Sequence, residues 1–239
     1  MGKLASVRIS FTFAASLTAM VNVSVAEAVT PSSPNVLFGM SEQPSINKIN
    51  AWENVLGRIR REATSYTLCV LHPARCPNDK TREWSEMIKV HQRDNRQTKL
   101  STVNDFFNQI TYAPDQKNYD ASDYWATLFE FLQKDAGDCE DYAIAKYITL
   151  RRLGFQARDL RIVVVKDTNT GIDHAILAYF PFDANAVILD NRRKEPVQEN
   201  TITNYKIYYS FNENGNWKYK ETALSEQASS LTQLSSPEP

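Results

Sequence analysis

The chain has 239 residues, of which 42% are hydrophobic and 23% charged, a composition that is typical of a globular protein and excludes wholesale disorder. Its formal net charge of -1 argues against nucleic acid as a partner, because such an interface calls for a basic face.

The N-terminal segment has the pattern of an export signal. A lysine and an arginine precede an apolar stretch over 9–26, and Ala26 and Ala28 complete an Ala-x-Ala cleavage pattern. An uncleaved membrane anchor is the alternative, since the stretch approaches the ~20 residues that span a bilayer. Polar residues dilute the stretch, so we expect a cleaved signal peptide at 1–28 and a soluble mature protein in the periplasm.

The remaining residues are enough for one substantial domain, which we place at 29–222. The Ser-, Gln- and Pro-rich segment 223–239 is expected to be a disordered tail. Apolar residues at helical spacing predict helices over 47–63 and 81–90, and a third helix that begins at the N-cap Ser101.

The three cysteines divide into a close pair and a single one. Cys69 and Cys76 lie in a Pro-containing loop, and they can form a disulfide in an oxidising compartment. A zinc site needs further ligands, which His72 alone does not supply. Cys139 is then the odd thiol, and an odd thiol is a candidate for chemistry.

The predicted elements change from helices to strands along the chain. A loop is predicted over 112–123 and a fourth helix over 124–132. The central helix begins with Asp138 as N-cap and Asp141 as its capping-box partner, and it stops at Gly154. Beyond it, β-rich runs predict strands over 160–165, 174–180, 186–190, 205–211 and 217–219, the last two joined as a hairpin.

Cys139, His174 and Asp190 follow one another on the predicted central helix and two predicted strands, the order expected of a cysteine-nucleophile enzyme. The positive end of the helix dipole stabilises a thiolate at Cys139. His174 would pair with it and protonate a leaving amine, while Asp190 would hold the imidazole tautomer. If the strands pair symmetrically about the turn 181–185, His174 and Asp190 face each other directly across the hairpin.

Each of these residues also has a plain structural interpretation. A cysteine at a helix start is more often inert than reactive, His174 can be a satisfied strand histidine, and the aspartate can simply begin a turn. Asp173 and Asp183 are rival third members. For the oxyanion, the backbone N–H of Cys139 is the expected donor, and the region of Trp125 is only a guess for the second.

The acidic residues around the thiol raise a separate question. Asp138, Glu140 and Asp141 should raise the pKa of the thiol and oppose thiolate formation. Helix capping explains two of them but leaves Glu140 free. The other interpretation is a hard cation such as calcium, which accepts carboxylate oxygens and is available outside the cytoplasm. Asp120 and Asp123, in the preceding loop, could supply further oxygens.

Together these residues resemble the LapG-type periplasmic proteases, which are bacterial transglutaminase-like cysteine proteinases. The similarity runs from about Trp52 to Tyr209, and its most specific part is the run Gly-Asp-Cys-Glu-Asp-Tyr at 137–142. The other matching segments are DYWAT at 123–127, AIAKY at 143–147, LRRLGF at 150–155, HAIL at 174–177 and LDN at 189–191.

The resemblance implies a papain/transglutaminase-like α+β fold, with Cys139, His174 and Asp190 as the triad. It also implies calcium dependence through Asp138 and Glu140. By the same resemblance, the expected substrate is the N-terminal region of a large surface adhesin, cut next to paired alanines so that the adhesin is released and biofilm disperses. The expected inhibitor is an inner-membrane cyclic-di-GMP receptor of the LapD type.

Two other classes of function stay open on the sequence. A transglutaminase or amidase would use the same triad on glutamine or on peptidoglycan-type amides. Its acceptor would differ, because a protease transfers the acyl group to water and a transglutaminase transfers it to an amine. A binding module would have this fold with an idle thiol, and the intact triad argues against that class.

Overall fold

The computed structural model describes residues 35–182 and 184–221. The expected signal peptide at 1–28, the expected tail at 223–239 and the rival residue Asp183 therefore lie outside the described residues. Among the helices that are described, none is both long and apolar enough to cross a membrane.

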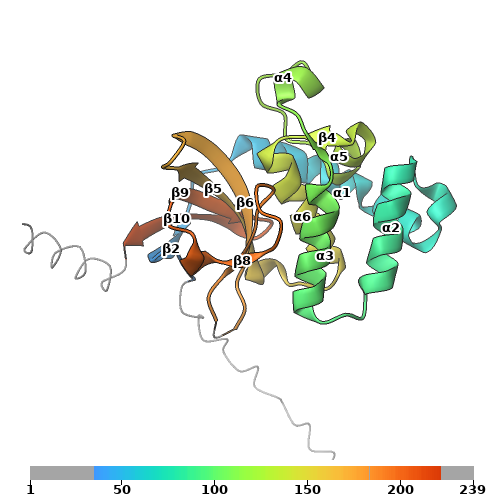
Figure 1. The fold of residues 1–239 in the computed structure, drawn as a ribbon. Coiled ribbons are helices and arrows are strands. Elements are labelled where there is room, and N and C mark those ends of the chain that lie inside the picture. The colour runs from blue at the N-terminus through green and yellow to red at the C-terminus, as the bar shows by residue number, and fades with distance from the viewer. Residues whose placement is uncertain (1–34, 183, 222–239) are drawn as a thin grey trace, which may run out of the picture. The chain divides into compact units, whose positions relative to one another are not determined.

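Helices form most of the first half of the described chain and surround a central helix, α6 (Cys139–Arg152). Every residue of α6 from Asp141 to Leu150 is buried. The helices gather on one side of the sheet (Figure 1), with α3 and α5 packed directly against α6. The surrounding helices are α1 (Asn50–Leu71), α2 (Asp79–His91), α3 (Arg96–Asn108), α4 (Asp115–Asn118) and α5 (Leu128–Lys134).

The helices predicted from apolar spacing are present, with different boundaries. α1 extends to Leu71, well past the predicted end. α3 begins before Ser101, because Asn95 is its N-cap and accepts the Thr98 N–H at 2.9 Å. α5 begins after residue 127, since Thr127 forms the capping box and the preceding residues stay extended.

Six strands from the second half of the chain join β1 and β2, which precede α1, in one eight-stranded sheet. Its neighbouring strands pair antiparallel in the order β1-β2-β10-β9-β5-β6-β7-β8. The hairpin β9–β10 was predicted, whereas β1, β2 and β8 were not. The strands are β1 (Val36–Leu37), β2 (Met40–Ser45), β5 (Leu160–Asp167), β6 (Ile172–Tyr179), β7 (Val187–Leu189), β8 (Val197–Gln198), β9 (Tyr205–Asn212) and β10 (Gly215–Glu221).

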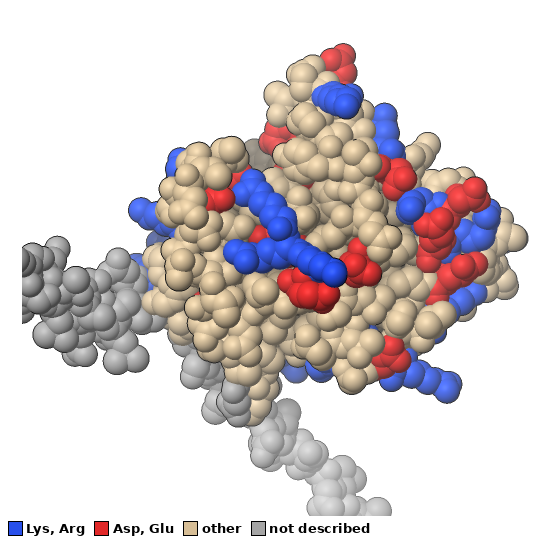
Figure 2. All heavy atoms as spheres, in the orientation of Figure 1, with Lys and Arg blue, Asp and Glu red and all other residues tan. Residues whose placement is uncertain are grey.

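The two faces of the sheet belong to two apolar clusters. Alternate residues point to opposite faces of a strand, so Ile162 and Leu177 join the large cluster shared with α6. Val163 and Ile176 join a smaller cluster on the other face. The fold is thus α+β, with N-terminal helices, a central helix that carries the cysteine, and an antiparallel sheet. On the face shown in Figure 2, basic and acidic side chains are interspersed.

A second, two-stranded sheet positions the start of α6. β3 (Thr111–Tyr112) pairs in parallel with β4 (Ala136–Gly137), immediately before the central helix. A Cβ added at Gly137 would lie 2.4 Å from Asp141 Oδ2 and 2.7 Å from the Phe131 ring, so only glycine fits this approach. At the other end, Gly154 has φ +95° and stops the helix, as predicted.

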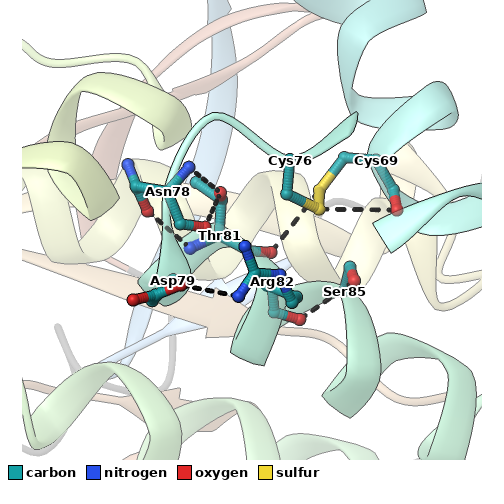
Figure 3. The surroundings of a disulfide bond; sticks show 7 residues. All are labelled: Cys69, Cys76, Asn78, Asp79, Thr81, Arg82 and Ser85. Atoms are coloured by element: carbon teal, nitrogen blue, oxygen red, sulfur yellow. Dashed lines mark hydrogen bonds and ion pairs between the residues drawn. A yellow bond between two sulfur atoms is a disulfide. The ribbon is translucent and has the colours of Figure 1, made fainter. Parts of the chain in front are cut away.

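A disulfide joins Cys69, near the end of α1, to Cys76 in the loop before α2 (Figure 3). This confirms the predicted pairing and removes the zinc alternative, because both thiols are consumed. The bridge lies beside the N-terminus of α2, where Asn78 Oδ1 accepts the Thr81 N–H at 2.8 Å. Among the described cysteines, Cys139 alone is free.

Candidate active site

His174 and Asp190 are in direct contact. His174 Nε2 lies 2.8 Å from Asp190 Oδ1, and both side chains are buried. The predicted register was wrong by two residues: Leu177 pairs with Leu189, which places Asp190 opposite Ile176 rather than opposite His174. An offset of two keeps both side chains on the same face of the sheet, so they still meet diagonally.

Asp190 accepts hydrogen bonds from three groups. Besides the imidazole, the Arg192 backbone N–H donates to Oδ1 at 2.9 Å and the Tyr205 hydroxyl donates to Oδ2 at 2.7 Å. Burial alone would raise the pKa of Asp190, but His174 and then these two donors lower it to about 2. The carboxylate is therefore charged at neutral pH and able to stabilise an imidazolium.

The loop after Asp190 is fixed to α3. Asn108 Nδ2 donates to the carbonyl oxygens of Asp190 and Arg193, at 3.0 and 2.8 Å. Asn108, like Tyr205, was not expected from the sequence, because it reaches this loop from an element distant along the chain.

Cys139 is the first residue of α6, as predicted, and it is partly buried. Cys139 packs against the apolar cluster to which Ala175, the residue after His174, belongs. The Nδ1 atom of His174 is buried and has no hydrogen-bond partner among the described residues. The structure thus brings the thiol beside the histidine's strand, but no hydrogen bond joins the two side chains.

The thiol of Cys139 donates instead to Glu140 Oε2, at 3.2 Å. Burial first, and then the charge and hydrogen bond of Glu140, raise the pKa of Cys139 well above its ordinary value. The helix N-terminus was expected to lower the pKa of Cys139, but burial and Glu140 together raise it by more.

Three carboxylates form a cluster at the start of α6. One oxygen from each of Asp115, Asp138 and Glu140 lies within 4.8 Å of the others. Asp115 Oδ1 and Asp138 Oδ1 are buried and have no hydrogen-bond partner among the described residues. Burial, and then the charge of Glu140, raises the pKa of Asp138 to about 8, and burial likewise raises the pKa of Asp115 and Glu140.

This cluster fits a hard cation. Calcium binds carboxylate oxygens, and a bound cation offsets the cost of burying several negative charges together. Asp115 was missed by the sequence analysis. Asp115 joins the cluster because β3 pairs with β4, and this pairing places the segment after Tyr112 beside Gly137 and Asp138.

The structure does not bring Asp123, Asp141 or Asp120 into the carboxylate cluster. Asp141 is fully buried, and its carboxylate accepts the backbone N–H groups of Ala126 at 2.8 Å and Asp138 at 3.4 Å. Asp141 therefore caps the N-terminus of α6, as the predicted capping box requires. Asp120 accepts from a glutamine amide at 2.9 Å, within the loop.

The sequence suggested the region of Trp125 for the second oxyanion donor, but the indole N–H of Trp125 already has an acceptor. Trp125 Nε1 donates to Asp123 Oδ1 at 2.9 Å, and its ring stacks on Phe211 with centroids 5.3 Å apart.

Comparison with known proteins gives the family. A family profile described as bacterial transglutaminase-like cysteine proteinase matches residues 58–223. No curated protein matches the sequence significantly.

Among solved structures, the chain is similar to Legionella pneumophila LapG, with 29% identity and a TM-score of 0.56 over 77% of this chain and 94% of that one. Calcium-bound LapG from the same organism has a TM-score of 0.55 at 29% identity, over 71% and 92% of the two chains. An EGTA-treated form has a TM-score of 0.56 at 29% identity, over 74% and 88%. The chain therefore belongs to the bacterial transglutaminase-like cysteine proteinases and is a cysteine protease of the LapG type.

Proposed function

We propose that this protein is a calcium-dependent endopeptidase whose catalytic triad is Cys139, His174 and Asp190. The observation that carries the proposal is the buried His174–Asp190 hydrogen bond of 2.8 Å, which leaves Nδ1 of the imidazole without a partner in the described part of the chain. In this proposal, Nδ1 is the atom that accepts the thiol proton. The packing of Cys139 against the apolar cluster that includes Ala175, next to His174, supports the assignment.

The reaction follows the usual course of acyl transfer to a thiolate. Cys139 Sγ attacks the scissile carbonyl carbon after its proton passes to His174, and the backbone N–H of Cys139 donates to the oxyanion that forms. The imidazolium then protonates the leaving amine, and a thioester remains on the sulfur. His174 next removes a proton from water, which attacks the thioester and releases the new carboxyl terminus. Asp190 stays ionised and orients the imidazole throughout.

Asp115, Asp138 and Glu140 are the residues that would hold calcium. When bound, the ion would supply positive charge to a cluster that otherwise opposes a thiolate at the neighbouring Cys139. The carboxylate of Glu140, which now accepts the thiol hydrogen bond, would then no longer hold the proton on sulfur. The calcium-bound solved form of Legionella pneumophila LapG supports this part of the proposal.

For the substrate, we propose the N-terminal region of a large surface adhesin, cleaved near paired alanines in the periplasm. Cleavage there would release the adhesin and disperse biofilm. We further propose that an inner-membrane cyclic-di-GMP receptor of the LapD type sequesters the protease. The similarity to LapG and the export pattern at 1–28 support these assignments.

The test uses the purified mature protein and recombinant N-terminal fragments of large surface proteins encoded in the same genome. We expect the wild-type enzyme to cut one fragment in calcium. Chelator-treated enzyme and the Cys139→Ala variant should not cut it. In water enriched in ¹⁸O, hydrolysis places the heavy oxygen in the new carboxyl terminus. Cleavage by Cys139→Ala would refute the triad, and incorporation of an added primary amine in place of water would indicate a transglutaminase.

A further inference from the structure

Tyr205 contacts the triad aspartate from a strand that carries none of the proposed catalytic residues. It is the first residue of β9, and its hydroxyl donates to Asp190 Oδ2 at 2.7 Å. The side chain is buried, and its ring meets the His174 ring edge-on with centroids 5.9 Å apart. One side chain therefore contacts both the carboxylate and the imidazole.

The two oxygens of Asp190 have unequal support. Among the described residues, Oδ1 accepts from both His174 and the Arg192 N–H, whereas Oδ2 accepts only from Tyr205 within hydrogen-bond distance. The other cation near Oδ2 is Arg193, whose Nε is 3.6 Å away, beyond a hydrogen bond. Because the terminal torsion of a carboxylate is soft, the Tyr205 hydroxyl is what keeps the carboxylate plane from turning.

Tyr205 is itself held rigidly. β9 pairs with β5 at Asp167, and β5 pairs in turn with β6, where Val165 stands opposite His174. Burial, and then the charge of Asp190, raises the pKa of Tyr205, so its hydroxyl keeps the proton that it donates. The sheet thus fixes the distance between this donor and the histidine.

We infer that Tyr205 is a positioning residue of the triad: its hydroxyl sets the rotation of the Asp190 carboxylate so that Oδ1 meets His174 Nε2. The inference rests on the proposed function, because it concerns the step in which His174 accepts and returns a proton. The Tyr205 hydroxyl acts only through Asp190, while the ring, which phenylalanine would keep, packs against His174.

The experiment compares Tyr205→Phe with wild type on the adhesin fragment that wild type cleaves in calcium. Loss of one hydrogen bond to a charged group should lower kcat about tenfold. KM should change less than twofold, since no substrate contact is lost. Tyr219→Phe is the matched control: it removes a hydroxyl that pairs with Ser210 Oγ at 2.8 Å in the same sheet, away from Asp190. Its kcat should equal that of wild type.

A double-mutant cycle separates positioning from a loss of general stability. In the Asp190→Ala background, Tyr205→Phe should have no further effect on kcat, because the group through which it acts is gone. A full, additive loss in that background would overturn the inference, as would an unchanged kcat in the single variant. If instead Cys139→Ala still cleaved the fragment, the proposed function itself would fail, and the two failures are therefore distinguishable.

Discussion

The thiol of Cys139 donates a hydrogen bond to the carboxylate of the next residue, Glu140, with Sγ and Oε2 3.2 Å apart. This contact keeps the proton on sulfur, because a thiolate in the same place would face a buried negative charge. Together with burial, it raises the pKa of the nucleophile in the absence of a cation. We therefore expect that neutralising the charge of Glu140 would lower the pKa of this thiol.

The first prediction concerns the reactivity of this thiol. In chelator at pH 7, iodoacetamide should alkylate Cys139 more slowly than a free cysteine, and added calcium should accelerate the reaction. Glu140→Gln should react faster than wild type in chelator, since the substitution removes the charge that raises the thiol pKa. The alkylated Cys139 peptide is quantified by mass spectrometry.

Asp123→Asn is the control for this experiment. Its carboxylate bonds to the Trp125 indole and not to the thiol, so its alkylation rate in chelator should match that of wild type. Equal rates for Glu140→Gln and wild type in chelator would show that Glu140 does not restrain the thiol.

The second prediction tests the composition of the calcium site. Asp115→Asn should weaken calcium binding at least about tenfold, as should Asp138→Ala, because each removes a charged ligand. In wild type, Asp115 Oδ2 accepts a hydrogen bond from the Tyr124 N–H. The side-chain oxygen of asparagine can accept the same bond, so Asp115→Asn should keep the fold. Calorimetry measures the affinity. Magnesium should bind poorly, since it prefers octahedral geometry and dehydrates reluctantly.

In the same titration, Asp123→Asn should bind calcium like wild type, since its carboxylate stands apart from the cluster. Binding should also stabilise the wild-type fold, by about 2.7 kcal/mol at a hundredfold excess of calcium over its dissociation constant. Weakened binding in Asp123→Asn with normal binding in Asp115→Asn would restore the ligand set expected from the sequence.

The third prediction concerns Asp190. Asp190→Asn should lower kcat by at least about a hundredfold, because an amide no longer enforces the imidazole tautomer that accepts the thiol proton. The melting temperature in calcium is measured alongside, to separate catalysis from folding. Asp183→Asn tests the rival residue suggested by the sequence. If Asp183→Asn were the damaging change and Asp190→Asn were not, the third member of the triad would have to be reassigned.

Local signals explain why part of this site could be predicted. The start of α6 follows from an N-cap and a glycine that are adjacent in sequence, so Cys139 falls at the first helical residue as expected. The meeting of His174 with Asp190 depends on strand register. The turn is not symmetric about the predicted centre, yet an error of two residues preserves the face of the sheet.

Contacts that depend on the tertiary fold could not be read from the sequence. Asp115 belongs to the carboxylate cluster only because the parallel pairing of β3 with β4 closes a loop between distant segments. Tyr205 reaches Asp190 from a strand at the end of the domain. The sequence made Asp141 a candidate metal ligand. In the structure its buried carboxylate instead accepts the Ala126 N–H and so fixes the segment before α5.

The central helix also contains a buried cation, which gives the fourth prediction. Lys146 is fully buried, and its Nζ donates to Asn104 Oδ1 at 2.8 Å. Asn104 in turn donates to the carbonyl oxygens of Arg193 and Lys194, both at 3.1 Å. Burial lowers the pKa of Lys146 to about 7, although the charge of Asp190 opposes the shift. A lysine in the unfolded chain titrates near pH ~10.4.

Between these two values the unfolded chain binds more protons than the folded one, so stability attributable to Lys146 rises with pH. Below about pH 7 both states are protonated, and the full cost of burying the charge is present. The free energy of unfolding of wild type, compared with Lys146→Met by urea denaturation in calcium, should therefore increase above pH 7. The slope of that difference should not exceed about 1.4 kcal/mol per pH unit.

Lys218→Met, at an exposed position on β10, should show a constant difference from wild type across the same range. If the Lys146→Met difference were also constant, Lys146 would remain charged in the folded protein through this range, held by Asn104 and Asp190 against the cost of its burial.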